Sequence, residues 1–386
     1  MLSLFYQNIV LKNPKSIFVL LLITLLSFGY FSKDFKLDAS SDTLLIEGDP
    51  DLEYLKEVTE RYGSKEFLIL TYSPNEGMVT ESSINNLLSL KYKIQSLDWV
   101  HSVITLLDIP LLNNSEAPLQ ERLESFKTLK DEGVDTERGF KEILNSPVFR
   151  NFVISEDGKT SGIIVYIKKD ALKDIQNKSA QEIENYKDTL KKKNHENITQ
   201  IREIIKSYQD VGKIYLGGIP MITDDMMSFI KSDIIVFGSA IIVFIILSLS
   251  FIFRQWQFVL LPLTTCVLTL IIMLGFLAAI DWRLTVISSN FIALLLIVGL
   301  SITIHLIVRY REFSSQNLML ERQENLRKTI NSMFQPCFYT LLTTIVAFVS
   351  LVVSGIRPVI DFGWMMIIGL SIAFVLAFVV IPAGLI

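Results

Sequence analysis

The stretch GLSITIHLIVRYRE, residues Gly299–Glu312, runs from an apolar helix pattern into a cluster of arginines. This pattern is typical of a membrane-spanning helix that ends at the inner side of a bilayer, where Lys and Arg accumulate. Ser301 and Thr303 stand where a proton-carrying helix would hold a carboxylate, and His305 follows them. The stretch therefore predicts a membrane protein, and it raises the question of what these polar side chains do inside the bilayer.

The whole chain is as apolar as this stretch implies. Half of its 386 residues are hydrophobic, its mean hydropathy is +0.43, and its net charge is −4. The apolar residues gather in long runs, which excludes an ordinary soluble protein with a single core. The sequence pI of about 5.6 and the lack of a basic stripe exclude nucleic acid as a partner.

The sequence offers no chemistry for a cofactor. Both cysteines, Cys266 and Cys337, lie inside apolar runs, so no disulfide framework is expected. Zinc-ligand spacing, a phosphate-binding loop and a dinucleotide fingerprint are all missing from the sequence. No nucleophile–base arrangement stands out, so we expect neither a metal, nor a cofactor, nor enzymatic activity.

Six apolar segments approach the roughly 20 residues that a spanning helix needs. The first, Ser16–Phe31, closes an N-terminal segment of residues 1–31 and is interpreted as a retained span, because no small-residue cleavage site follows it. A polar region of residues 32–232 separates it from a helical bundle of residues 233–386. The five spans of this bundle are expected at about 233–253, 258–280, 284–308, 335–354 and 362–386. Residues 314–332, between two of these spans, predict an amphipathic helix on the inner surface.

The basic residues of the short loops predict the orientation. With a cytoplasmic N-terminus, the inner segments hold Lys12, Lys15, Arg254, Arg309, Arg311, Arg322, Arg327 and Lys328. The outer short loops then hold only Arg283 and Arg357. The predicted protein is a multi-pass protein of a bacterial inner membrane, with residues 32–232 in the periplasm.

The polar region has the pattern of an α+β domain. Apolar alternation predicts strands at Glu66–Tyr72, His101–Leu107, Ser161–Lys168 and Lys213–Leu216. Helical patterns at Glu81–Leu97 and Ser179–Gln209 lie between them. With a helical insert of about residues 117–147 set aside, the order is βαββαβ, which predicts a ferredoxin-like sandwich.

The polar residues of two spans fall on helical faces. Asn290, Leu294, Ile297, Ser301 and His305 recur at the spacing of one helix face. Thr343 and Ser350 lie on a similar face of the next span, with Thr340, Ala347 and Ser354. Because polar groups in a bilayer are costly unless they face protein or a watery cavity, both faces are expected to point toward other helices. Two interpretations stay open: close helix packing through small and hydroxyl side chains, or the polar lining of an ion relay.

Four aspartates lie near the ends of predicted spans. Asp224 and Asp225 are expected at a solvated helix start. Asp233 and Asp361 are expected to open the second and sixth spans, as N-cap or interface residues that the helix dipole favours.

The order of these segments resembles one known family. NPKSIFVLLLITLL, GGIPMITDDMMSFIKSD, IHLIVRYRE and LLTTIVAFVSLVVSGIRPVIDFGWMMIIGL are similar to the corresponding parts of the resistance-nodulation-division (RND) superfamily. Within it, the chain most resembles the MMPL-type and sterol-sensing-domain-like exporters. The resemblance implies export of a hydrophobic or lipid-like substrate, driven by an ion gradient, with membrane lipid as the surroundings.

Two departures from this family matter. Its full members repeat the six-span unit, so the resemblance implies a second RND half, either in the same chain or in a homo-oligomer. Many relatives have Asp eight residues before the arginine that corresponds to Arg309, and this chain has Ser301 there. The runner-up function is therefore a sterol-sensing-like membrane scaffold or lipid sensor that does not transport.

Overall fold

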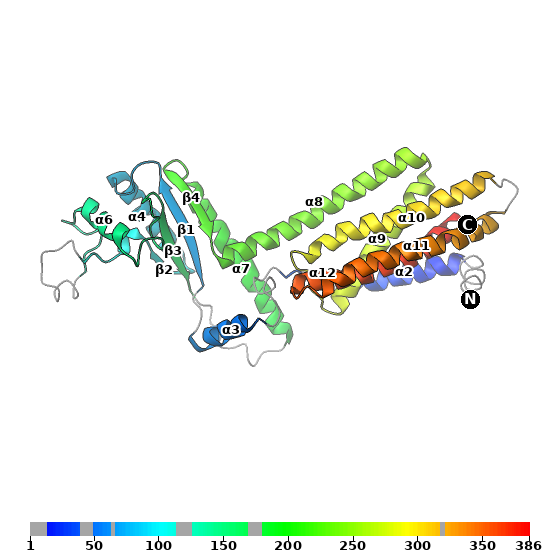
Figure 1. Cartoon of the computed structure of the whole chain (residues 1–386), viewed down its shortest axis with the longest axis horizontal. Helices are drawn as coiled ribbons and strands as arrows, with labels where there is room; N and C mark the ends of the chain where they lie inside the picture. The colour runs from blue at the N-terminus through cyan, green and yellow to red at the C-terminus, as the bar shows by residue number, and fades with distance from the viewer. Residues whose placement is uncertain (1–13, 39–48, 63–65, 113–125, 169–179, 317–320) are drawn as a thin grey trace. The chain divides into compact units, whose positions relative to one another are not determined.

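The computed structural model describes residues 14–38, 49–62, 66–112, 126–168, 180–316 and 321–386 (Figure 1). The protein is mostly helical and divides into two compact units. One unit, Tyr54–Asp225, holds a four-stranded sheet. The other combines Met1–Glu53 with Met226–Ile386 and holds the apolar helices.

Six helices of the described residues are long and apolar enough to cross a membrane. They are α2 (Pro14–Phe31), α8 (Ile219–Phe253), α9 (Trp256–Ala279), α10 (Phe291–Gln316), α11 (Arg322–Val352) and α12 (Arg357–Leu385). The short 3₁₀ helix η6 (Ser288–Asn290) leads into α10. The six spans expected from hydropathy are therefore present, and several helices extend beyond their apolar stretches.

The extensions change the expected positions of some polar residues. Because α8 begins at Ile219, Asp233 lies inside a helix and does not cap one. Asp361 lies in the first turns of α12, where its Oδ1 accepts a hydrogen bond from Trp282 Nε1 at 3.2 Å. Residues 322–332 belong to α11 itself, so in the described part of segment 314–332 the chain is helix α10 up to Gln316 and helix α11 from Arg322.

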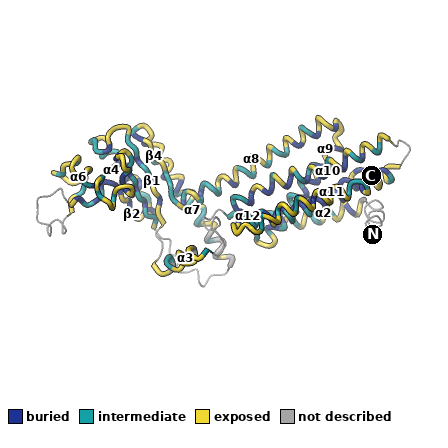
Figure 2. Tube along the Cα trace, in the orientation of Figure 1, coloured by how far each residue is buried: buried dark blue, intermediate teal, exposed yellow. Residues whose placement is uncertain are grey.

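Burial separates central from peripheral helices (Figure 2). In α9, α10 and α12, at least half of the residues in the apolar segment of the helix are buried. In α8 and in α11, the buried share of that segment is 11%. The core side chains of α10 and α12 interlock with those of α9, and Leu295, Met365 and Leu370 are almost completely buried. The helix α10 therefore has one buried face and one open face.

Two glycines allow the helices to approach closely. A methyl group added at Gly275 of α9 would overlap the backbone carbonyl of Phe28 in α2. At Gly369 of α12, an added methyl would press on the side chain of Leu295 of α10. In lipid, the hydrophobic effect does not drive helices together. Small residues at such crossings let the helices approach closely, so that van der Waals packing stabilises their contact.

The sheet unit, Tyr54–Asp225, contains an antiparallel sheet of four strands: β1 (Phe67–Pro74), β2 (Val100–Ile104), β3 (Ser161–Ile167) and β4 (Gly212–Gly217). Their order in the sheet is β2-β3-β1-β4, and Leu70 pairs with both Ile163 and Leu216. The helix α4 (Glu81–Gln95) lies between β1 and β2 in the chain, and α7 (Ala180–Lys206) lies between β3 and β4. The helices α3 (Pro50–Tyr62) and α6 (Thr136–Asn145) complete the described helices before α7.

One face of the sheet shares an apolar core with α4, α6 and α7. Alternate residues of β1, Leu68, Leu70 and Tyr72, are buried in one cluster with Leu87 and Leu90 of α4. This alternation is the period of two expected for a strand with one covered face. The four strands predicted from the sequence are present, and no predicted end differs from the observed one by more than three residues.

A partly buried ion pair joins α4 to the turn after β2. Lys91 Nζ lies 2.5 Å from Asp108 Oδ1, and Lys130 Nζ lies 3.2 Å from the same oxygen. The backbone N–H of Thr105 donates to Asp108 Oδ2. Burial by itself would raise the pKa of Asp108, but the hydrogen bonds from Lys91, Thr105 and Lys130 together hold it below its usual value.

Candidate functional site

The predicted polar face of α10 is open in the structure. Asn290, Ser301 and His305 are exposed, and so are Leu294 and Ile297 between them. The spacing that placed these residues on one helix face therefore describes a continuous stripe of residues that are exposed in the described part of the chain. We call it the α10 stripe.

Thr303 is separated from this stripe. Its side chain is fully buried, and its Oγ1 donates to the backbone carbonyl of Leu300 at 2.7 Å. It thus faces the bundle core, although it lies only two positions from Ser301. Its hydroxyl is satisfied within its own helix and stabilises no contact between helices.

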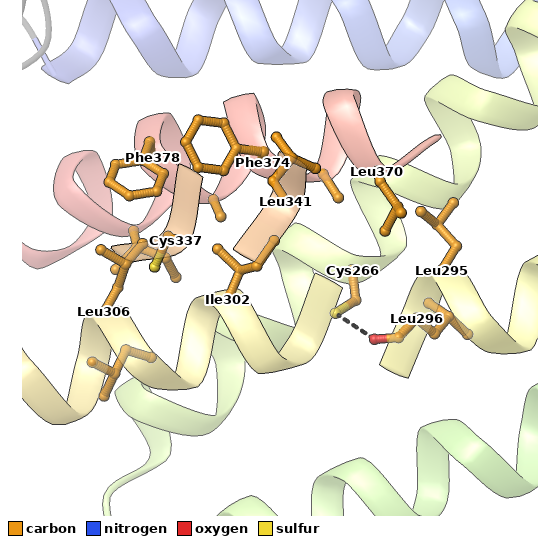
Figure 3. Close-up of a cluster of buried hydrophobic side chains, with 14 of the residues drawn as sticks. Cys266, Leu295, Leu296, Ile302, Leu306, Cys337, Leu341, Leu370, Phe374 and Phe378 are labelled. Atoms are coloured by element: carbon orange, nitrogen blue, oxygen red, sulfur yellow. Dashed lines mark hydrogen bonds between the residues drawn. The ribbon is translucent and has the colours of Figure 1, made fainter. Parts of the chain in front are cut away.

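The α10 stripe borders a small cavity between α10, α11 and α12. The cavity has a volume of about 40 Å³, enough for one water molecule or one small cation. It is lined by Val298, Ser301, Ile302, His305, Cys337, Thr340, Leu341, Thr344 and Leu370. Four of the apolar residues, Ile302, Cys337, Leu341 and Leu370, lie together in Figure 3 and form its inner wall. The structure therefore brings Ser301 and His305 together with hydroxyls of α11.

The hydroxyls of α11 are only partly those that the sequence indicates. Thr340 lines the cavity as expected, and so does Thr344, which the helical spacing did not single out. Thr343 and Ser350 are exposed on α11 and do not line it. Thr343 Oγ1 donates to the carbonyl of Thr340, and Ser350 Oγ donates to that of Ala347.

Hydrogen bonding decides what this cavity can do chemically. Thr340 donates its hydroxyl proton to Pro336 O at 3.0 Å, and Thr344 donates to Thr340 O at 2.8 Å. Each hydroxyl oxygen keeps lone pairs, so both can accept a proton donor or coordinate a cation. In the described part of the chain, the Ser301 hydroxyl and the His305 ring form no hydrogen bond. These two side chains are therefore available to a water molecule, an ion or a partner helix.

The cavity contains no carboxylate. The acid nearest to it along α10 is Glu312, whose carboxylate lies 2.5 Å from Arg309 Nη1 beyond the apolar stretch. His305 is the titratable side chain on the polar part of its lining. Across the described residues, no three His, Cys, Asp or Glu side chains gather as metal ligands. Among the described residues that line this cavity, His305 is thus the one basic side chain.

A second polar cluster, at the start of α8, corrects the expectation of a solvated helix start. Asp224 is buried, and its Oδ1 lies 2.8 Å from Nδ1 of His195 on α7. Asp225 Oδ1 lies 2.5 Å from Arg202 Nη2, and Asn194 donates its amide to Pro220 O. These partners stand more than 20 positions apart in the chain, so no local sequence pattern could have identified them.

The match with known families agrees with this geometry. The family model described as "MMPL family" matches residues 111–386. The chain belongs to the MMPL family. The search of curated proteins found no match. As an MMPL-family chain with six candidate spans, it is a multi-pass membrane protein, consistent with a transporter-like role.

Proposed function

We propose that this MMPL-family protein is an RND-type exporter of a hydrophobic or lipid-like substrate, driven by an ion gradient. The observation that carries the proposal is the α10 stripe, an open polar face on a central helix of the bundle. In a bilayer, such a face is stable only against protein or water. A second RND half, in the same chain or in a second copy, would cover it, and the relay acid would lie in that half.

The unit that holds the sheet would serve on the outer side. In this proposal it is a ferredoxin-like periplasmic domain of a bacterial inner membrane protein, and it collects or passes the substrate. Its strand order, β2-β3-β1-β4 with helices after β1 and β3, supports that fold. A reporter active only in the periplasm should be active when inserted near Asn194 and silent when inserted near Arg322. The opposite pattern would contradict the orientation.

The transport test uses efflux of the lipophilic dye Nile red from re-energised cells that produce the full chain. Export should stop with a protonophore. Ser301→Ala should keep most of the export, because a hydroxyl does not gain and lose a proton at accessible pH. His305→Ala should lower the protein yield but leave the pH profile of export unchanged. Asn290→Ala is the matched control, because it lies on the same stripe outside the cavity.

Two results would indicate that the ion-relay residue lies in this chain's six-span half and not in a second half. A shifted pH profile in His305→Ala would make the imidazole a carrier, and complete loss of export in well-folded Ser301→Ala would indicate cation coordination. Export that ignores the protonophore would contradict ion-gradient coupling itself.

Contact with a second copy is tested by cross-linking. Both native cysteines are buried, so a cysteine introduced at Ile297 would be the reactive one. Oxidation of Ile297→Cys should give a disulfide dimer if a second copy covers α10, whereas Phe251→Cys on the open side of α8 should not. A monomer in both cases would place the second half in the same chain or contradict the covering of the stripe.

A second function is favoured by one observation, the lack of a carboxylate around the cavity. A sterol-sensing-like scaffold or lipid sensor needs a site between helices but no proton carrier. It would bind lipid with no energy-dependent efflux of any probe, and the protonophore experiment separates it from an exporter.

A further inference from the structure

A second hollow lies between α8 and α9. It has a volume of about 430 Å³, within the range of sites that hold small molecules. It is lined by Ile246, Ser250, Arg254, Gln255, Trp256, Val259, Leu260 and Leu263. None of these residues borders the cavity at Ser301, so this groove is a separate feature.

The groove is amphipathic along its length. Its polar residues, Ser250, Arg254 and Gln255, gather at the turn that joins the two helices. Its apolar residues extend from that turn along the two spans, and Leu260 is half exposed. Since α8 and α9 are both candidate spans, the turn must lie at a membrane–water interface, whichever side it faces. The polar end thus lies at headgroup depth and the apolar part at acyl-chain depth.

Trp256 supports this placement. It begins α9 and is 71% exposed. Tryptophan accumulates at membrane interfaces because its ring is apolar and its N–H is polar. Trp256 also lines the groove, at the end where its polar residues gather.

Arg254 supplies a charge for that headgroup. Two other arginines at this end already have partners: Arg309 pairs with Glu312, and Arg311 lies 5.5 Å from the ring centres of Phe253 and Phe258. Within the described ranges, the guanidinium of Arg254 has no carboxylate within ion-pair distance. Its backbone has a φ of 55°, a left-handed conformation that is uncommon for arginine. An exposed cation beside an apolar groove matches an anionic phosphate joined to a hydrocarbon chain.

We propose that the α8–α9 groove binds an anionic membrane phospholipid, with its phosphate on Arg254 and one acyl chain along Ile246, Val259 and Leu263. This site is independent of export and of the second RND half. The lipid is a bound component of the membrane unit and is distinct from the proposed substrate. Binding holds the ends of α8 and α9 at a fixed depth in the bilayer.

The test uses the full chain in phosphatidylcholine vesicles and the fluorescence of Trp256. The quenching that belongs to Trp256 is the difference between the native chain and Trp256→Phe. Brominated phosphatidylglycerol should quench it at about five-fold lower mole fraction than brominated phosphatidylcholine, the factor expected for one basic residue at the surface. Arg254→Asn should abolish this difference, and asparagine retains the left-handed backbone.

Three further arms make the outcome decisive. Arg327→Gln is the control, because it removes an equal charge from an arginine that lies beside Glu324, and it should leave the preference unchanged. Leu263→Phe should fill the groove and weaken quenching by both lipids. Inorganic phosphate should not compete. Equal quenching by both lipids, a preference that survives in Arg254→Asn, quenching unaffected by Leu263→Phe, or displacement by free phosphate would each overturn the proposal.

Discussion

The ion pairs of the sheet unit and the hydroxyls of the membrane helices find their partners in different ways. In the sheet unit, polar contacts join distant parts of the chain: Lys91 with Asp108, Ser73 with Thr160, and His195 with Asp224. In the membrane unit, hydroxyls bond to their own helix: Thr265 to Leu261 O, Thr269 to Thr265 O, and Thr303 to Leu300 O. Polar pairs thus add specific long-range contacts to the apolar core of the sheet unit, whereas the contacts between membrane helices depend on shape.

The difference reflects the two solvents. In water, an apolar core makes most of the stability, and buried polar groups need specific partners. In lipid, a hydroxyl without a partner is costly, and the nearest carbonyl is always one turn away in the same helix. Helix contacts in the membrane unit must then come from close approach at residues such as Gly275 and Gly369.

The largest expected effect comes from adding a methyl group to such a close contact. Gly275→Ala should destabilise the membrane unit by about 3 kcal/mol, the upper end of the usual cost of overpacking, because the methyl meets the backbone of Phe28. The measurement is the fraction of SDS that unfolds the purified chain. Gly238→Ala is the matched control, because Gly238 lies in α8 with open space around it. An equal loss of stability in both variants would show that close helix packing at Gly275 does not stabilise the membrane unit.

The sheet unit should respond next most strongly, to the loss of a polar partner. Lys91→Met removes the inner partner of Asp108, which lies in a partly buried position and keeps only Lys130 as its cation, and should cost about 2 kcal/mol. Hydrogen exchange of the β1 and β3 amides measures the loss. Lys130→Met removes the outer, more exposed partner and should cost less than about 1 kcal/mol. If Lys130→Met cost more than Lys91→Met, burial would not decide the strength of the pair.

Acid should weaken the same contact by a smaller amount. The pKa of Asp108 is lowered in the folded protein, so its carboxylate adds stability above the unfolded pKa of about 4. That contribution is lost as the pH falls through the folded pKa. The stability difference between the native chain and Asp108→Asn should therefore shrink as the pH falls below about 5. Urea unfolding followed by an acid-tolerant protease measures it, and a constant difference would contradict the role of the charge.

The smallest effect is expected for a hydroxyl inside the bundle. Thr303→Val keeps the side-chain shape and removes a bond to Leu300 O, and it should cost about 0.6 kcal/mol, the mean for hydrogen bonds in membranes. Thr269→Val in α9 should behave alike. SDS unfolding again measures both. A loss above about 2 kcal/mol would mean that Thr303 makes a contact between helices.

The sequence predicts regular elements better than it predicts the partners of side chains. Hydropathy locates the six spans, and alternation locates strands such as Phe67–Pro74. Hydropathy cannot locate helix ends, because α8 continues through the polar residues before Asp233. Helical spacing placed Ser301 and His305 on one face, but it could not show that Thr344 joins them, because that depends on how α11 rotates against α10.

The contact between α2 and α9 has a consequence for the time course of synthesis. Phe28 leaves the ribosome about 250 residues before Gly275, which at about 5–20 residues per second is a delay of about 12–50 s. During that interval α2 lies in the lipid without α9 beside it. Its stretch from Ser16 to Phe31 carries no charged side chain, and Thr24 bonds to Leu20 O of its own helix. The first span is thus built to persist alone in the bilayer until its partner arrives.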